Sequence, residues 1–131
     1  MKKLIQILIV CGIFVFMGGT ASGDDFQDGM DAYKRKDFKE AVRLFRLSAE
    51  QGNPRAQYNL GYMYQRAQGV PEDFKEAIKW FRLSVEQLEK QGKHKERMEN
   101  MKEHIKHMQE VIANRAVDEK KKAEETANAF E

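Results

Sequence analysis

The sequence predicts an all-α fold: a short right-handed α-solenoid of two helical hairpins, followed by a long C-terminal capping helix. The strongest indication is an internal repeat, because residues 37–51 align without a gap with residues 73–87 and 11 of the 15 positions are identical. Repetition at a fixed period of this length is typical of stacked helical hairpins. Apolar residues recur at spacings of three and four in both copies, and no stretch alternates as a strand would.

Residues 1–23 have the composition of an export signal. Two lysines precede an apolar run over residues 4–17, and small residues follow it. We therefore expect cleavage after Ala21 or Gly23 and a periplasmic or secreted protein. An uncleaved membrane anchor is the alternative, although the apolar run is shorter than the about 20 residues that a membrane span needs.

Charge and cysteine content narrow the classes of function. The chain holds 23 Lys and Arg against 21 Asp and Glu, and the two excess lysines lie in the signal, so residues 24–131 are formally neutral. A general electrostatic attraction to nucleic acid is therefore not expected. Cys11, the single cysteine, also lies in the signal, where its context does not suit lipidation. A mature chain of about 108 residues thus forms one small domain without a disulfide.

The first hairpin is predicted over about residues 24–52. Its second helix begins after Asp37, which is suited to cap a helix N-terminus, and ends at Gly52. Leu44 and Leu47 widen the apolar stripe of this helix, which predicts burial on two sides, as in a middle layer. The stripe itself follows helical spacing and consists of Phe38, Ala41, Val42, Phe45 and Ala49.

The second hairpin is predicted over about residues 53–92. Asn53 is placed to cap its first helix, and Gly61 allows the paired helix to approach closely because it has no side chain. A loop then leads to Asp73, which is placed to cap the second helix. Glu76, three residues later, completes the sequence pattern of a reciprocal capping box.

Residues 56–87 resemble a Sel-one-like (Sel1-like) repeat, a relative of the tetratricopeptide repeat. The motifs that carry the resemblance are the AxxxLGxMY helix, the glycine-valine loop with its following aspartate, and the KEAIKWF helix. Residues 28–52 resemble the shorter, tetratricopeptide-like unit that often precedes such a repeat. The resemblance implies a scaffold for protein–protein interaction rather than an enzyme.

Residues 93–131 are predicted to form a charged amphipathic helix with a frayed tail of about ten residues. Its apolar residues form one seam with alternating spacings of three and four: Met98, Met101, Ile105, Met108 and Ile112. One interpretation is a capping helix that covers the apolar face of the second hairpin. The other is a methionine-rich surface for self-association or for a partner.

A partner-binding face is predicted on the first helix of each hairpin. Tyrosine and arginine suit such a face because they offer large contact area and hydrogen-bonding tips. Tyr58 and Tyr62 are its clearest members, and packing between the hairpins is the alternative role for them. The candidate binding residues, those of the first hairpin included by resemblance, are Met30, Tyr33, Lys34, Arg55, Tyr58, Tyr62, Gln65 and Arg66.

No catalytic residue, metal or cofactor is predicted. The sequence has no GxSxG motif, no Cys/His pair and no glycine-rich phosphate loop. His104 and His107 lie one helical turn apart, but zinc needs three or four convergent ligands, so we interpret them as exposed histidines on a polar helix face.

The leading hypothesis is an exported, non-enzymatic helical-repeat adaptor that binds a protein or peptide in the bacterial cell envelope or outside the cell. The alternative is a self-associating structural protein assembled through the methionine-rich helix. A β-lactamase-like hydrolase is a remote alternative. Some exported Sel-one-like proteins have been given that name, but the cysteine-rich ones pair two cysteines per repeat, and residues 24–131 of this chain contain no cysteine. Nucleic acid is not an expected partner, and the membrane is expected only through an uncleaved signal.

Overall fold

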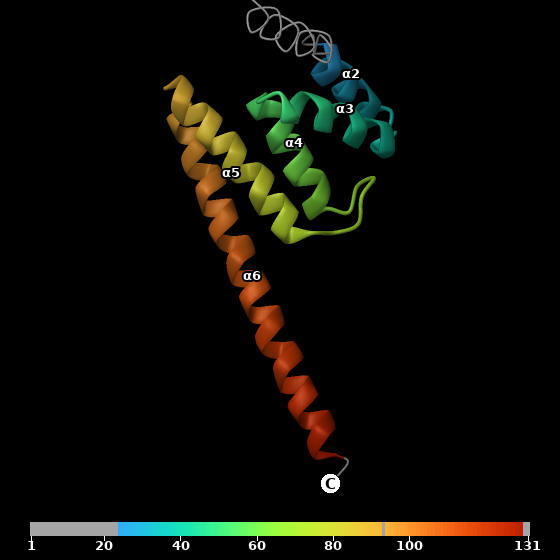
Figure 1. The fold of residues 1–131 in the computed structure, drawn as a ribbon, viewed down its shortest axis with the longest axis vertical. Coiled ribbons are helices and arrows are strands. Elements are labelled where there is room, and N and C mark those ends of the chain that lie inside the picture. The colour runs from blue at the N-terminus through green and yellow to red at the C-terminus, as the bar shows by residue number, and fades with distance from the viewer. Residues whose placement is uncertain (1–23, 93, 130–131) are drawn as a thin grey trace, which may run out of the picture.

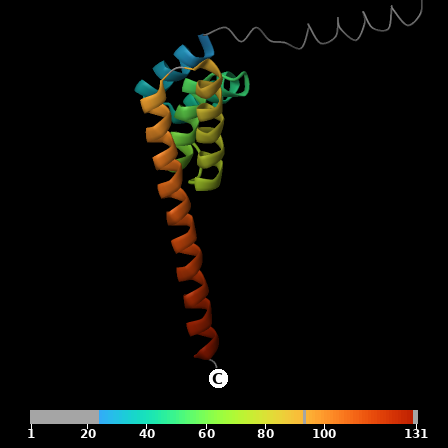
Figure 2. The same cartoon turned by 90° about the vertical axis from the view of Figure 1, so that its left-hand side faces the viewer.

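The computed structural model describes residues 24–92 and 94–129, so the predicted export signal lies outside the described residues. Helices α2 and α3 form one hairpin, and α4 and α5 form the next (Figure 1). α6 runs back along α5 and then continues past both hairpins (Figures 1 and 2). The described residues contain no strand, and their helices are α2 (Asp24–Lys34), α3 (Phe38–Glu50), α4 (Pro54–Gln65), α5 (Phe74–Gln91) and α6 (Lys95–Asn128). The protein is therefore an all-α helical-repeat solenoid, as predicted.

The helix starts follow the predicted capping residues. In each case a side-chain oxygen accepts backbone N–H hydrogen bonds from the first turn of the next helix: Asp37 for α3, Asn53 for α4 and Asp73 for α5. The reciprocal half of the predicted capping box is not formed. The Asp73 N–H donates to the Tyr64 carbonyl at 3.0 Å instead, and the Glu76 carboxylate pairs with Lys79.

The first hydrophobic core lies between α2, α3 and α4, with Trp80 of α5 added to it. Phe45 is 1% exposed within this core, and a Cβ on Gly29 of α2 would lie 2.8 Å from its ring, so only glycine fits there. Leu44 is buried, but the prediction of burial for Leu47 is wrong, because its side chain is 38% exposed. Its counterpart in the second repeat, Leu83, does pack against this core, whereas no described helix covers Leu47.

Close contact between α4 and α5 depends on Gly61, as predicted. A Cβ at this position would lie 3.0 Å from the Ala77 carbonyl oxygen and 3.1 Å from the Phe81 ring. A hydrogen bond from the buried Ser84 Oγ to the Pro54 carbonyl oxygen, at 2.7 Å, joins α5 to the start of α4. The second hairpin is thus fixed at both the middle and the beginning of α4.

The apolar seam of α6 packs on α5 and forms a second core with it. Met101, Ile105 and Met108 are buried in this core, and Met98 and Ile112 are partly buried at its ends. The first part of α6 therefore covers the apolar face of the second hairpin, which is the arrangement expected of a capping helix. The seam side chains are consequently used within the chain and do not form an open surface.

Beyond the seam, α6 leaves the body of the protein and is exposed along its length (Figure 2). The last contact is an ion pair between Arg115 and Glu72, at 3.1 Å. The helix is continuous to Asn128, where the sequence predicted a frayed tail. Lysine, alanine and glutamate favour helix here, with opposite charges four residues apart, as in Lys120 and Glu124. No helix of the described part is both long and apolar enough to span a bilayer.

Candidate functional site

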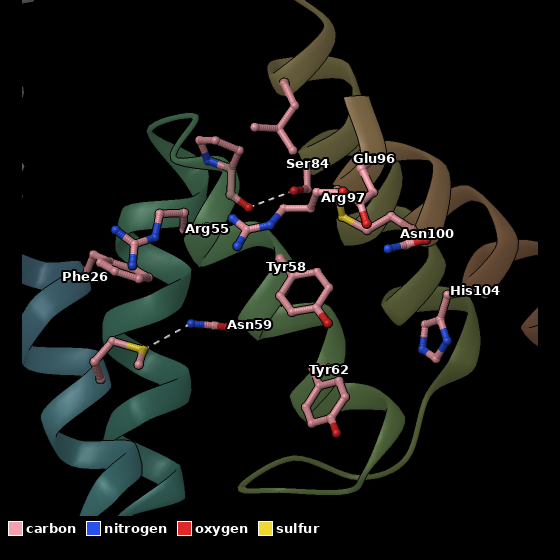
Figure 3. A pocket seen from close by; sticks show the side chains of 14 residues that line it. Phe26, Arg55, Tyr58, Asn59, Tyr62, Ser84, Glu96, Arg97, Asn100 and His104 are labelled. Atoms are coloured by element: carbon pink, nitrogen blue, oxygen red, sulfur yellow. Dashed lines mark hydrogen bonds between the residues drawn. The ribbon is translucent and has the colours of Figure 1, made fainter. Parts of the chain in front are cut away.

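A groove of about 560 Å³ runs along α4, between α2 on one side and the beginning of α6 on the other (Figure 3). Its residues come from four helices, and α5 contributes Ser84 and Leu88. α2 contributes Phe26 and Met30, α4 contributes Arg55, Tyr58, Asn59 and Tyr62, and α6 contributes Glu96, Arg97, Asn100, Met101 and His104. A smaller depression of about 210 Å³, lined also by Tyr33, shares Met30 and both tyrosines with it.

Tyr58 and Tyr62 form the aromatic floor of the groove. Their ring centroids are 6.3 Å apart with an angle of 21° between the planes, which is a stacked arrangement. Tyr58 also packs on the buried Phe81, at 5.4 Å between centroids, and yet remains 38% exposed. The pair is thus held by the core beneath it while presenting aromatic surface to the groove.

The α2 side of the groove is held by polar contacts with α4 and its loop. The Asn59 amide donates to the Met30 sulfur at 3.3 Å, and the Tyr33 hydroxyl donates to Gln68 Oε1 at 3.1 Å. The Tyr33 ring also packs on Phe38, at 5.3 Å between centroids. These contacts fix the position of α2 relative to α4, and therefore the α2 wall of the groove.

Three of the predicted binding residues line neither the groove nor the smaller depression beside it. Lys34 forms an ion pair with Asp31 at 3.2 Å on the exposed side of α2. The Arg66 guanidinium lies 4.4 Å from the centroid of the Tyr62 ring and stacks against it from outside the lining. Gln65 faces α6, where its side-chain oxygen contacts a histidine. The other five predicted residues are brought together: Met30, Tyr33, Arg55, Tyr58 and Tyr62.

His104 is not the freely exposed histidine that the sequence indicated. Its Nε2 lies 2.7 Å from Gln65 Oε1, an arrangement satisfied by the tautomer that carries the proton on Nε2. The edge of its ring also meets Phe81, at 5.4 Å between centroids. Burial lowers the pKa of His104, and the nearby His107 lowers it further, so the imidazole in the groove is mainly uncharged at neutral pH. His107 itself is exposed.

The α6 wall was missed at the sequence level. Arg97, Asn100 and His104 follow one another at spacings of three and four, directly beside the apolar seam. This pattern places them along one flank of the seam, and the flank adjoins α4 once α6 has docked on α5. Phe26 and Asn59, which also line the groove, were not singled out either.

The groove suits recognition through contact and hydrogen bonding. It offers aromatic faces, amides and guanidinium groups, and the hydroxyl of Ser84 is already hydrogen-bonded to the Pro54 carbonyl. Within residues 24–92 and 94–129, no three His, Cys, Asp or Glu side chains converge as metal ligands would. The lining therefore resembles a protein-binding surface in composition, with tyrosine, methionine and arginine prominent.

Two stacked helical hairpins with an internal sequence repeat are the architecture of a helical-repeat protein. The family model of the Sel1 repeat matches the chain twice, over residues 26–53 and 54–87, so the hairpin that resembled a tetratricopeptide-like unit is matched as a Sel1 repeat too. Sel1 repeats are generally non-enzymatic and generally mediate protein–protein interaction. The searches of curated proteins and of solved structures found no match to this chain.

Proposed function

We propose that this protein is an exported, non-enzymatic adaptor that binds a peptide or protein segment in the groove along α4, in the bacterial cell envelope or outside the cell. The observation that carries the proposal is the stacked tyrosine pair on the floor of a groove of about 560 Å³, in which Tyr58 is exposed and Tyr62 is partly buried. Tyrosine is enriched among the residues that dominate binding energy at protein interfaces.

Each side of the groove is fixed by contacts within the chain, which supports a binding role. Its floor rests on the buried Phe81, and its α6 wall is fixed by the buried Met101 and Met108. Its α2 wall is tied to α4 through the Met30–Asn59 contact. A preformed surface loses little conformational entropy on binding, so more of the contact energy is retained as affinity.

The adaptor role is tested by substituting the two tyrosines on the floor of the groove. We expect Tyr58→Ala/Tyr62→Ala to reduce partner recovery about tenfold or more, since hot-spot residues, among which tyrosine is enriched, cost about 2 kcal/mol or more of binding free energy when truncated. The measurement is crosslinking in the native cell with quantitative mass spectrometry, after circular dichroism has shown that the variant folds.

Leu47→Ala is the matched control for this experiment. The Leu47 side chain is 38% exposed, the same fraction as that of Tyr58, but it lies outside the groove lining. The Leu47→Ala variant should recover partners at the same level as the unmodified protein. Equal recovery of every partner by the tyrosine variant would show that the groove is not the binding face.

Export is proposed from the sequence of residues 1–23, with its lysines, its short apolar run and its small residues before the acidic start of α2. We expect the protein from the native cell to begin at Ser22 or Asp24, as measured by intact mass after fractionation. A full-length chain in the membrane fraction would support the anchor alternative, and a full-length chain in the cytoplasm would contradict export.

The two alternatives gain no support from the structure of the described residues. Self-association through the methionine seam would need side chains that are buried against α5, notably Met101 and Met108. A β-lactamase-like hydrolase would need an activated nucleophile, and the one serine lining the groove, Ser84, is fully buried and bonded to a backbone carbonyl.

A further inference from the structure

We propose that the groove selects an acidic peptide segment, whose carboxylates lie between Arg55 and Arg97 and whose apolar side chains lie on Tyr58 and Tyr62. This inference rests on the proposed function, because it names the chemistry of the partner that the same groove takes. It follows from the positions and the ion-pairing of the charged side chains around the groove.

Arg55 and Arg97 both line the groove: the Arg55 side chain extends over Phe26 on the α2 side, and Arg97 lies on the α6 side (Figure 3). Arg55 belongs to α4 and Arg97 to α6, and Figure 3 shows the Arg97 side chain extending towards α4. Both residues are exposed, and neither forms an ion pair with another described residue. Arg43 and Arg115 have carboxylate partners at 2.6 and 3.1 Å, whereas the exposed Arg35 and Arg82, outside the groove, are unpaired among the described residues as well.

Arg55 is also held in position. Its guanidinium lies 4.6 Å from the centroid of the Phe26 ring, and this cation–π contact restricts the long side chain. A guanidinium fixed against an aromatic face still presents its N–H groups at its edge, where a carboxylate accepts two parallel hydrogen bonds. Arg55 therefore loses less side-chain entropy than a free surface arginine when it binds an anion.

The groove contains few carboxylates of its own. Glu96 is its one acidic lining residue, against the two arginines. Three α2 aspartates are outside the groove lining: Asp31 is paired with Lys34, Asp25 is close enough to Arg43 to add to the rise that the Glu40 carboxylate causes in the pKa of that guanidinium, and Asp28 lies on the side of α2 opposite Phe26 by helical periodicity. The surplus of guanidinium over carboxylate favours an acidic partner and disfavours a basic one.

Two arginines are a small charge for a nucleic acid, which requires many phosphate contacts for useful affinity at physiological salt. The aromatic floor also favours a peptide over a nucleic acid, because it provides apolar area directly beside the charged end of the groove. A segment with acidic residues next to aromatic or aliphatic residues satisfies both parts of the lining at once.

The test is selection from a random peptide display library on the protein purified after expression of the full chain. We expect the enriched peptides to combine Asp or Glu with aromatic or aliphatic residues. A synthetic copy of one such peptide should bind Arg55→Gln/Arg97→Gln about tenfold or more weakly, since each charge-assisted contact is strong. The peptide with Asn and Gln in place of its acids should lose a similar factor.

Arg35→Gln/Arg82→Gln is the matched control, because it removes the same charge from two exposed arginines outside the groove lining. Its affinity for the peptide should equal that of the unmodified protein, and an equal loss in both variants would overturn the inference. A second outcome is the selection of neutral or basic peptides that bind Arg55→Gln/Arg97→Gln normally but do not bind Tyr58→Ala/Tyr62→Ala. That outcome would overturn the acidic preference and leave the proposed function standing. Selection of no peptide that needs the tyrosines would overturn both.

Discussion

Replacing Phe81 by alanine is expected to lower the free energy of unfolding by about 3–5 kcal/mol, the usual range for a large aromatic residue deleted from a core. The side chain is 0% exposed. It meets Tyr58 of α4 and His104 of α6, each at 5.4 Å between ring centroids, and it lies against Gly61. Its loss leaves a cavity that three helices border. Chemical denaturation followed by circular dichroism measures the effect.

The internal repeat provides the comparison for Phe81. Phe45 occupies the equivalent position in the first repeat and is 1% exposed, so Phe45→Ala should destabilise the protein by a similar amount. Leu47→Ala, which removes a partly exposed side chain from the same helix as Phe45, should change the stability much less. A loss below about 1 kcal/mol for Phe81→Ala would contradict the arrangement of the core under the groove.

Met108→Asp is expected to cost more than about 4 kcal/mol and to detach α6 from α5. The side chain is 1% exposed in the second core, so the substitution removes a buried apolar group and places a carboxylate in its position. Since α6 forms one wall of the groove, the variant should also bind partners poorly. Thermal unfolding measures the loss of stability, and limited proteolysis measures the detachment of α6.

Val117→Asp is the matched control for the capping helix. It makes a similar chemical change in the same helix, but Val117 is 65% exposed and lies beyond the last contact of α6 with the body. Its stability should stay within about 0.5 kcal/mol of the unmodified protein. If both substitutions had equal effects, α6 would not act as a cap through its apolar seam.

Much of the fold follows from local sequence. The two DFKEA segments place an aspartate before each second helix, and both aspartates accept the expected N–H hydrogen bonds. Gly61 could be interpreted from its position in a helix, because a helix interior rarely keeps glycine without a packing reason. The seam of α6 also follows from spacing alone. In each case the sequence pattern that allowed the prediction lies within one helix or at its start.

Features that depend on two segments distant in sequence were not predicted. Gly69 has a φ of +73°, and a Cβ there would lie 2.4 Å from the Phe38 carbonyl oxygen, so the α4–α5 loop packs directly on the start of α3. The exposure of Leu47 depends on which helices surround α3. The charged wall of the groove depends on which flank of the α6 seam turns towards α4, and spacing within α6 does not determine that choice.

The two ends of α6 have different surroundings, and this has a practical use. The first turns border the groove, whereas the last turns stand away from the other helices of the described residues (Figure 1). From Val117 to Asn128 the distance is about 17 Å, at 1.5 Å per residue. A fluorophore, an affinity tag or a surface-coupling group attached at the carboxyl end would thus be kept clear of a bound peptide. Immobilised protein would then present its groove outward.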